Sequence, residues 1–135
     1  MPPSRTIPHL IRLSRRVNAA ATEQLLGMTP KQAWILAALR DHGELPQTEL
    51  CELMRTTQNT VVTWLNELEE VGFVTRLRDP DDRRKHNVAL TEKGAASLER
   101  AETELRRLED ETLVGLSIDE RTQLRRLLAK ALDAL

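Results

Sequence analysis

The chain is poor in aromatic residues and in cysteine. Aromatic side chains make up 2% of its 135 residues, namely Trp34, Trp64 and Phe73, and there is no tyrosine. The core must therefore be built mainly from leucine, valine, alanine and isoleucine, which suits helices packed on helices. A single cysteine, Cys51, excludes an intramolecular disulfide and favours a cytosolic setting.

Long hydrophobic runs are also absent. Arg12, Arg15 and Arg16 interrupt the apolar stretch from Ile7 to Val17, so this segment lacks the apolar core of a secretory signal. No run approaches the roughly 20 apolar residues of a membrane span. We therefore expect a soluble, cytoplasmic protein without a membrane partner.

Residues typical of an enzyme or a metal site are missing. His9, His42 and His86 are scattered, with no cysteine or paired carboxylates at ligand spacing, so we expect no metal and no cofactor. No nucleophile–base pattern and no glycine-rich phosphate loop is present. The sequence therefore argues against an enzyme, and an enzyme that uses a dimer cleft is the weaker alternative.

Charge of neither sign dominates, but its distribution is uneven. The net charge is -1, with 30% charged and 40% hydrophobic residues, as in a folded chain. The segment 99–111 is rich in acids, whereas a shorter segment gathers the basic residues Arg76, Arg78, Arg83, Arg84, Lys85 and Lys93. A basic segment on an acidic body can contact a phosphate backbone without a high overall charge.

Helical periodicity and end signals predict six helices. The first four are expected at about Ser4–Leu26, Thr29–Asp41, Leu45–Leu53 and Gln58–Val71, and the last two begin at Thr91 and at Ser117. Gly27 ends the first helix, Pro46 opens the third and Thr57 caps the fourth. The pairs Thr29/Gln32 and Ser117/Glu120 form capping boxes at the starts of the second and sixth.

A short hairpin follows the fourth predicted helix. Phe73–Arg78 and Lys85–Leu90 read as strands around an apex of aspartate, proline and arginine. The two helices before it are separated by a tight turn at Arg55 and Thr56, which gives a helix-turn-helix outline. The predicted fold class is mainly α with a small β-hairpin wing, a winged helix-turn-helix.

The fourth predicted helix has two distinct faces at helical spacing. We assign the core face to Val61, Leu65, Leu68 and Val71, with Trp64 on its flank. The opposite face carries Asn59, Thr63 and Asn66, flanked by Gln58 and Val62. Amide side chains can pair with adenine, and threonine and valine can touch the thymine methyl. An ordinary polar surface helix is the alternative interpretation.

The predicted wing supplies the positive charge. Arg83, Arg84 and Lys85 are placed for contact with the DNA backbone or minor groove. We expect the neighbouring aspartates to hold the arginines by ion pairing. A solvated charged turn is the alternative, but a hairpin after a helix-turn-helix favours DNA.

The segments Leu68–Val74, Asp79–Arg84 and Val88–Gly94, together with Arg76, closely resemble the MarR (multiple antibiotic resistance regulator) family. The resemblance implies a homodimer with interlocking first, fifth and sixth helices, bound to palindromic double-stranded DNA. It also implies a repressor that a small aromatic or phenolic ligand releases. It places Arg84 in the minor groove and gives Arg83 a more structural role.

Two features of the chain depart from the family pattern. The recognition helix contains no arginine or lysine, so phosphate attraction must come from Arg55 and the wing. Pro46 stands where the family tends to have a serine or threonine cap. The sequence and the resemblance together place DNA contacts at Thr57, Gln58, Asn59, Val62, Thr63 and Asn66, and at Arg55, Arg83, Arg84 and Lys85.

The resemblance also divides the chain. The whole chain, 1–135, is expected to form one MarR-like domain, with a DNA-binding lobe at 29–90 and dimerisation helices at 4–26 and 91–135. The expected dimer contacts are Leu10, Leu13, Val17, Leu124, Leu127, Leu128 and Leu132. The candidate ligand residues are Leu13, Arg16 and Trp34, although a tryptophan in an amphipathic helix is usually a core residue.

Other functions remain as alternatives. The same helix could dock a protein instead of DNA. Cys51 could be a redox sensor, but its place between Leu50 and Leu53 favours a small core residue. A metal-switched regulator is disfavoured by the scattered histidines.

Overall fold

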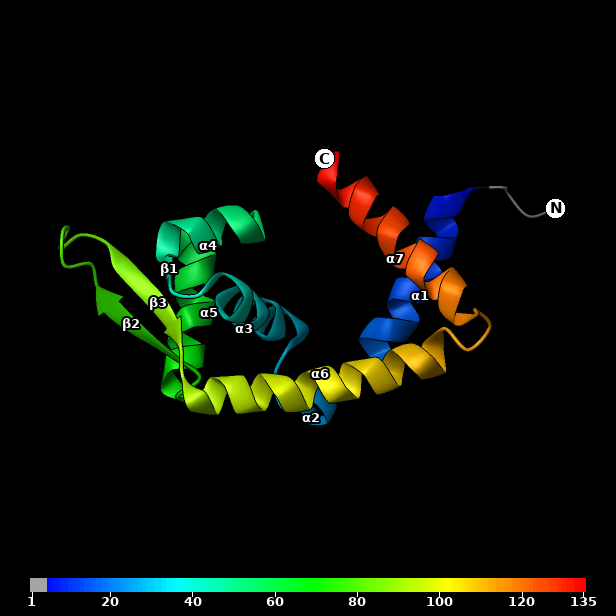
Figure 1. Ribbon diagram of the computed structural model, residues 1–135, viewed down its shortest axis with the longest axis horizontal. Helices are drawn as coiled ribbons and strands as arrows, with labels where there is room; N and C mark the ends of the chain where they lie inside the picture. The colour runs from blue at the N-terminus through cyan, green and yellow to red at the C-terminus, as the bar shows by residue number, and fades with distance from the viewer. Residues whose placement is uncertain (1–4) are drawn as a thin grey trace. The chain divides into compact units, whose positions relative to one another are not determined.

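The computed structural model describes residues 5–135 (Figure 1). The chain divides into two compact units. Unit 1 is formed by the chain up to Ala20 together with Leu105–Leu135, and unit 2 is Ala21–Glu104. The lobe expected at 29–90 falls within unit 2. The expected helix start at Ser4 lies outside the described residues.

Unit 2 combines short helices with a small sheet. Its elements are α2 (Glu23–Leu26), α3 (Pro30–His42), β1 (Leu45–Pro46), α4 (Gln47–Met54), α5 (Gln58–Glu70), β2 (Val74–Arg78), β3 (His86–Leu90) and the first part of α6 (Glu92–Thr112). Unit 1 holds α1 (Thr6–Ala20), the rest of α6 and α7 (Ile118–Asp133). The mainly α fold with a small β wing is confirmed.

Local capping signals predicted several helix ends correctly. The Thr29 hydroxyl accepts from the backbone N–H of Gln32 at 3.2 Å, and the Gln32 side chain accepts from the N–H of Thr29 at 3.0 Å. Ser117 and Glu120 form the same reciprocal pair, at 3.2 and 2.9 Å. Both boxes satisfy N–H groups that a helix start otherwise leaves unpaired.

The first predicted helix is wrong as one continuous element. The structure ends α1 at Ala20 and begins α2 at Glu23. Thr22 between them has extended backbone, and its hydroxyl accepts from the N–H of Leu25 at 3.2 Å. A threonine hydroxyl can cap a new helix instead of continuing the old one, and the apolar spacing masked this competition.

The helix expected from Leu45 is also corrected. Leu45 and Pro46 form β1, and the helix begins only at Gln47. β1 pairs antiparallel with β3, Leu45 opposite Val88 and Pro46 opposite Asn87, so the sheet order is β1-β3-β2. Proline has no N–H to donate, which suits this short edge strand.

The core of unit 2 lies between the helices and the sheet. Ile35, Leu36, Leu50, Val61, Leu65, Leu68, Val74, Val88 and Leu98 are almost wholly buried. The core assignment of Val71 is wrong: this residue follows the last residue of α5, Glu70, and is 46% exposed. Trp34 on α3, a candidate ligand residue from the sequence, is 53% exposed and so is not the core residue that its place in a helix would ordinarily make it.

A tight junction joins α5, the sheet and α6. The N–H of Phe73 donates to the carbonyl of Leu68 at 2.9 Å, and the N–H of Thr91 donates to the carbonyl of Phe73 at 3.1 Å. The Thr91 hydroxyl donates to the Gly72 carbonyl at 2.6 Å and accepts from the N–H of Gly94 at 3.0 Å. A Cβ on Gly94 would lie 2.1 Å from the Phe73 carbonyl oxygen. Only glycine fits there.

This close approach makes Gly94→Ala a destabilising change. An alanine in place of a helical glycine ordinarily stabilises a protein by about 1 kcal/mol. Here the methyl group must displace backbone, so we expect the free energy of unfolding to fall by about 2 kcal/mol or more. Urea denaturation measures this value. Gly115→Ala is the matched control, because a Cβ there meets nothing within 4 Å. Equal stability of the two variants would contradict the packing argument.

Candidate nucleic-acid interface

The packing of α5 determines which of its side chains face outward. Its hydrophobic stripe is buried, and Asn59, Thr63 and Asn66 are exposed on the other side. Gln58 is also exposed, and Val62 is half-buried. The Thr63 hydroxyl donates to the carbonyl of Asn59 at 3.0 Å, which leaves the methyl group for apolar contact. The predicted face is therefore a real surface.

The start of α5 is held by its own cap. The Thr57 hydroxyl accepts from the N–H of Thr60 at 3.3 Å and lies 2.8 Å from the Thr60 hydroxyl oxygen. Just before it, Arg55 ends α4 with a left-handed φ of 49°, and its N–H donates to the carbonyl of Glu52 at 3.2 Å. Thr57 therefore caps the helix that presents the amides.

Arg76 on β2 bridges to α5. Its guanidinium donates to the Asn66 side-chain oxygen and to the Glu69 carboxylate, the latter at 3.0 and 3.3 Å. These hydrogen bonds from Arg76 hold the pKa of Glu69 below its usual value. A lowered pKa means that the pair stabilises the fold above the unfolded pKa of about 4.3, and that this contribution is lost as the pH falls further.

The wing apex is organised by backbone bonds to aspartate. The N–H of Asp81 donates to the Asp79 carboxylate at 2.8 Å, and the N–H of Arg84 donates to the Asp82 carboxylate at 3.0 Å. The expectation of ion pairs to the arginines is therefore corrected: across residues 5–135, none joins these aspartates to Arg83 or Arg84. Short aspartate side chains close turns on their own backbone instead. Arg83, Arg84 and Lys85 are exposed.

The structure brings the wing against the starts of α4 and α5. A depression of about 60 Å³ is lined by Gln58, Arg84 and Lys85 together with Pro46, Gln47, Thr48 and His86. The first three were predicted, and the other four were missed. The pairing of β1 with β3 carries the start of α4 to the wing. Helix N-termini beside basic side chains suit phosphate.

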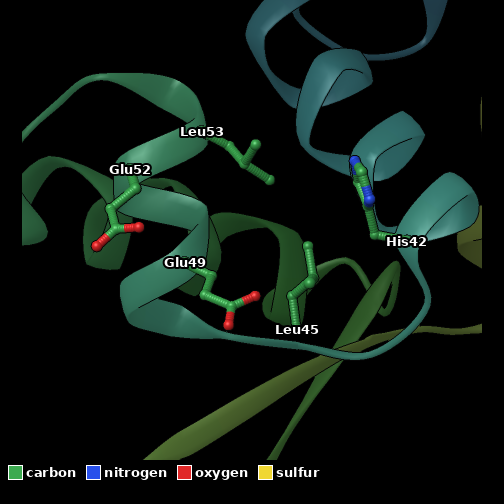
Figure 2. A pocket seen from close by; sticks show the side chains of 5 residues that line it. All are labelled: His42, Leu45, Glu49, Glu52 and Leu53. Atoms are coloured by element: carbon green, nitrogen blue, oxygen red, sulfur yellow. The ribbon is translucent and has the colours of Figure 1, made fainter.

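A second depression in unit 2 has the opposite charge. Figure 2 shows it between α3 and α4, with Leu53 pointing toward His42. Its volume is about 370 Å³, and Glu49, Glu52 and Leu45 complete the lining. The two carboxylates repel phosphate, so this part of α4 is unsuited to the nucleic-acid backbone.

The histidine, cysteine and acidic side chains are the groups that bear on metal and redox chemistry. Across 5–135 no three histidine, cysteine, aspartate or glutamate side chains are placed to hold a metal ion. Burial raises the pKa of the half-buried Cys51 thiol, which lowers its thiolate fraction and hence its reactivity. None of the helices in this part of the chain is long and apolar enough to cross a membrane.

Unit 1 exposes much apolar surface. Neither α1 nor α7 has a buried residue. Of the predicted dimer contacts, Leu10, Leu13, Val17 and Leu124 are half-buried, and Leu127, Leu128 and Leu132 are exposed.

Unit 1 also contains a hollow of about 320 Å³. It is lined by His9, Arg12, Leu13, Arg16 and Thr112. Leu13 and Arg16 are candidate ligand residues from the sequence, and the structure brings them to this hollow. Trp34, the third candidate, belongs to unit 2. Two guanidinium groups beside a leucine suit an anion with an apolar body.

Known proteins resemble the chain in sequence and in fold. The MarR family model matches residues 28–86. The HTH-type transcriptional repressor NicR of Pseudomonas putida is 33% identical over 131 residues, which are 95% of this chain and 83% of NicR. Bordetella bronchiseptica BpsR, whose DNA binding is regulated by 6-hydroxynicotinic acid, superimposes with a TM-score of 0.82 at 29% identity, over 98% of this chain and 97% of BpsR. A mutant MarR from E. coli complexed with operator DNA gives 0.78 at 27% identity, over 93% of each chain.

Proposed function

Because this chain belongs to the MarR family of transcriptional regulators, we propose that it is a repressor that binds a palindromic operator as a homodimer and is released by a small aromatic acid. The observation that carries the proposal is the joining of the basic wing to the starts of α4 and α5. This arrangement presents positive charge beside the uncharged, amide-bearing first turns of α5, residues 58–66.

The two parts of this surface have different tasks in the proposal. α5 enters the major groove, where Gln58, Asn59, Val62, Thr63 and Asn66 contact base edges. Arg84 enters the minor groove, and Arg55, Arg83 and Lys85 meet phosphates. Neutral side chains cannot attract the backbone from a distance, so affinity depends on the wing and sequence choice depends on α5.

Replacement of Arg84 by alanine tests the wing. We expect weaker binding to a genomic operator. The slope of log binding constant against log salt concentration should also be smaller in magnitude by about one unit for each phosphate that the variant no longer neutralises. Fluorescence anisotropy at several salt concentrations measures both quantities. Arg126→Ala on α7 is the matched control, since that arginine is exposed, lies outside the proposed DNA surface and points away from the helix face of Leu128 and Leu132. An unchanged slope in Arg84→Ala would remove Arg84 from the interface, and no salt-dependent binding by the natural protein would favour a protein-docking role.

Dimerisation is supported by the unburied leucines of α7. Leu128 and Leu132 are four residues apart and share one helix face, at 40% and 64% exposure. Burial of such side chains contributes about 1.5–3 kcal/mol each. A second copy of unit 1 offers the same apolar surface, as a twofold dimer requires.

The double change Leu128→Lys and Leu132→Lys should therefore produce a monomer. Each lysine would have to bury an ammonium group in the interface. Analytical ultracentrifugation at micromolar concentration should show a dimer for the natural protein and a monomer for the variant. Gln123→Lys, on the opposite face of α7, should stay dimeric. A double variant that remains a dimer would contradict this role of α7.

The effector site is proposed at the hollow in unit 1. BpsR responds to 6-hydroxynicotinic acid, which has a carboxylate on an aromatic ring. Arg12 and Arg16 can meet the carboxylate and Leu13 the ring. Ligand binding in unit 1 and DNA binding by unit 2 are then coupled, and each weakens the other by the same factor.

Arg16→Ala tests this site with 6-hydroxynicotinic acid as the probe. The acid should raise the melting temperature of the natural protein and weaken its operator binding, and both effects should disappear in Arg16→Ala. The uncharged amide of the same acid should have little effect, because it lacks the anion. Arg15→Ala is the control, since Arg15 is exposed but does not line the hollow. Equal responses of Arg16→Ala and the natural protein would exclude the site.

A further inference from the structure

Asn59 and Asn66 lie on one stripe of α5, but their surroundings differ. Seven residues make about two turns, so the two amides are separated by roughly 10 Å along the helix. Among residues 5–135, the side-chain amide of Asn59 makes no hydrogen bond, whereas the side-chain oxygen of Asn66 accepts one from Arg76.

The chemistry of arginine determines the orientation of the Asn66 amide. A guanidinium group has N–H donors and no acceptor, so the Asn66 atom that faces Arg76 must be the oxygen. Arg76 is itself held by two hydrogen bonds to the Glu69 carboxylate, and its side chain is only 20% exposed. The Asn66 amide is therefore held with its oxygen toward β2, and its NH₂ group is the part left for an outside partner.

This orientation changes which base Asn66 can recognise. Bidentate pairing with adenine needs both halves of the amide, the oxygen for N6–H and the NH₂ group for N7. The Asn66 oxygen keeps a second lone pair, but it is directed at Arg76 on β2, so the two halves of this amide do not face one base together and the NH₂ donors are the group turned outward. Guanine presents two neighbouring acceptors, N7 and O6, and thymine presents O4, whereas cytosine presents only the N4 donor. Adenine has one acceptor, N7, but its N6 donor lies beside it and repels an NH₂ group, so guanine and thymine suit the outward donors better. Asn59 keeps both halves and can still pair with adenine.

We propose that Arg76 is a positioning residue that fixes the polarity of base recognition at Asn66, so that the operator base facing Asn66 is guanine or thymine and not cytosine. The inference rests on the proposed DNA binding by α5. The two asparagines of α5 would then not both recognise adenine. Asn59 would pair with adenine, and Asn66 would donate to guanine or thymine. Arg76 acts without touching the DNA itself.

The first test is Asn66→Asp. A carboxylate keeps one oxygen on Arg76 and turns the other, an acceptor, toward the base. The preferred base at that site should change from guanine or thymine to cytosine or adenine, which present donors. The second test is Arg76→Ala, which frees the Asn66 oxygen and should move the preference toward adenine. Arg78→Ala is the matched control, because this neighbouring arginine is exposed on the same strand.

The experiment selects operators from a random library with the natural full-length protein and then measures affinity for all four base pairs at each position. Asn66→Ala identifies the relevant position as the one where discrimination disappears. There the natural protein should bind cytosine about tenfold or more weakly than guanine, and Asn66→Asp should reverse this order. Arg78→Ala should alter affinity without changing the order of bases. Melting temperatures check that each variant is folded.

The possible failures are distinct. A natural protein that selects no sequence contradicts the proposed function, and the inference falls with it. Specific selection with adenine preferred at the Asn66 position, or no position affected by Asn66→Ala, overturns the inference and leaves DNA binding intact. If Arg76→Ala does not fold, Asn66→Asp still decides, because it retains Arg76.

Discussion

The geometry of the proposed DNA surface depends on the close approach of Gly94 to the carbonyl of Phe73. At this point the end of α5, the first residue of the hairpin and the start of α6 share backbone hydrogen bonds. A side chain on Gly94 would push these segments apart. Because the junction has little freedom, the hairpin must leave α5 in one direction, and Arg76 on its first strand then reaches back to α5. The wing and the recognition helix thus behave as one body.

Charge is divided between the parts of this body in an unusual way. The first turns of the recognition helix, residues 58–66, carry no charge, its last turn carries the exposed Glu67, Glu69 and Glu70, and the cations are on the hairpin and beside the helix starts. Uncharged side chains gain little from non-specific attraction to DNA phosphates. The free-energy cost of a wrong base pair is therefore not offset by phosphate contacts of the same helix turns. In the proposed arrangement the hydrogen bond from Arg76 to Asn66 adds a second effect, because a cation that does not itself contact DNA determines which half of the Asn66 amide faces the base. Substitutions in the hairpin can therefore change sequence preference as well as affinity.

Unit 1 has the opposite character. Its outer helices bury no side chain fully, and its leucines remain exposed in a single chain. A helix pair with this much uncovered apolar surface is stabilised when another copy covers it. The proposed effector hollow lies in the same unit, beside arginines that are poorly suited to an apolar interface. An anion bound there would neutralise them, which gives a ligand a means to shift the proposed dimer between arrangements.

The parts of this protein that were correctly predicted from its sequence are those governed by neighbours in the chain. The Thr29 and Ser117 capping boxes, the hydrophobic stripe of α5 and the aspartate-rich turn depend on residues within about four positions of one another. The same local logic failed where a distant segment decides the outcome. β1 exists because β3, more than forty residues later, offers it hydrogen bonds, and two residues carry no periodicity of their own. Likewise the outward face of α5 was predictable from helical spacing. The partner of Asn66 is set by the fold, because Arg76 reaches Asn66 only once the chain has reversed direction between α5 and β2, at the Phe73–Gly94 junction.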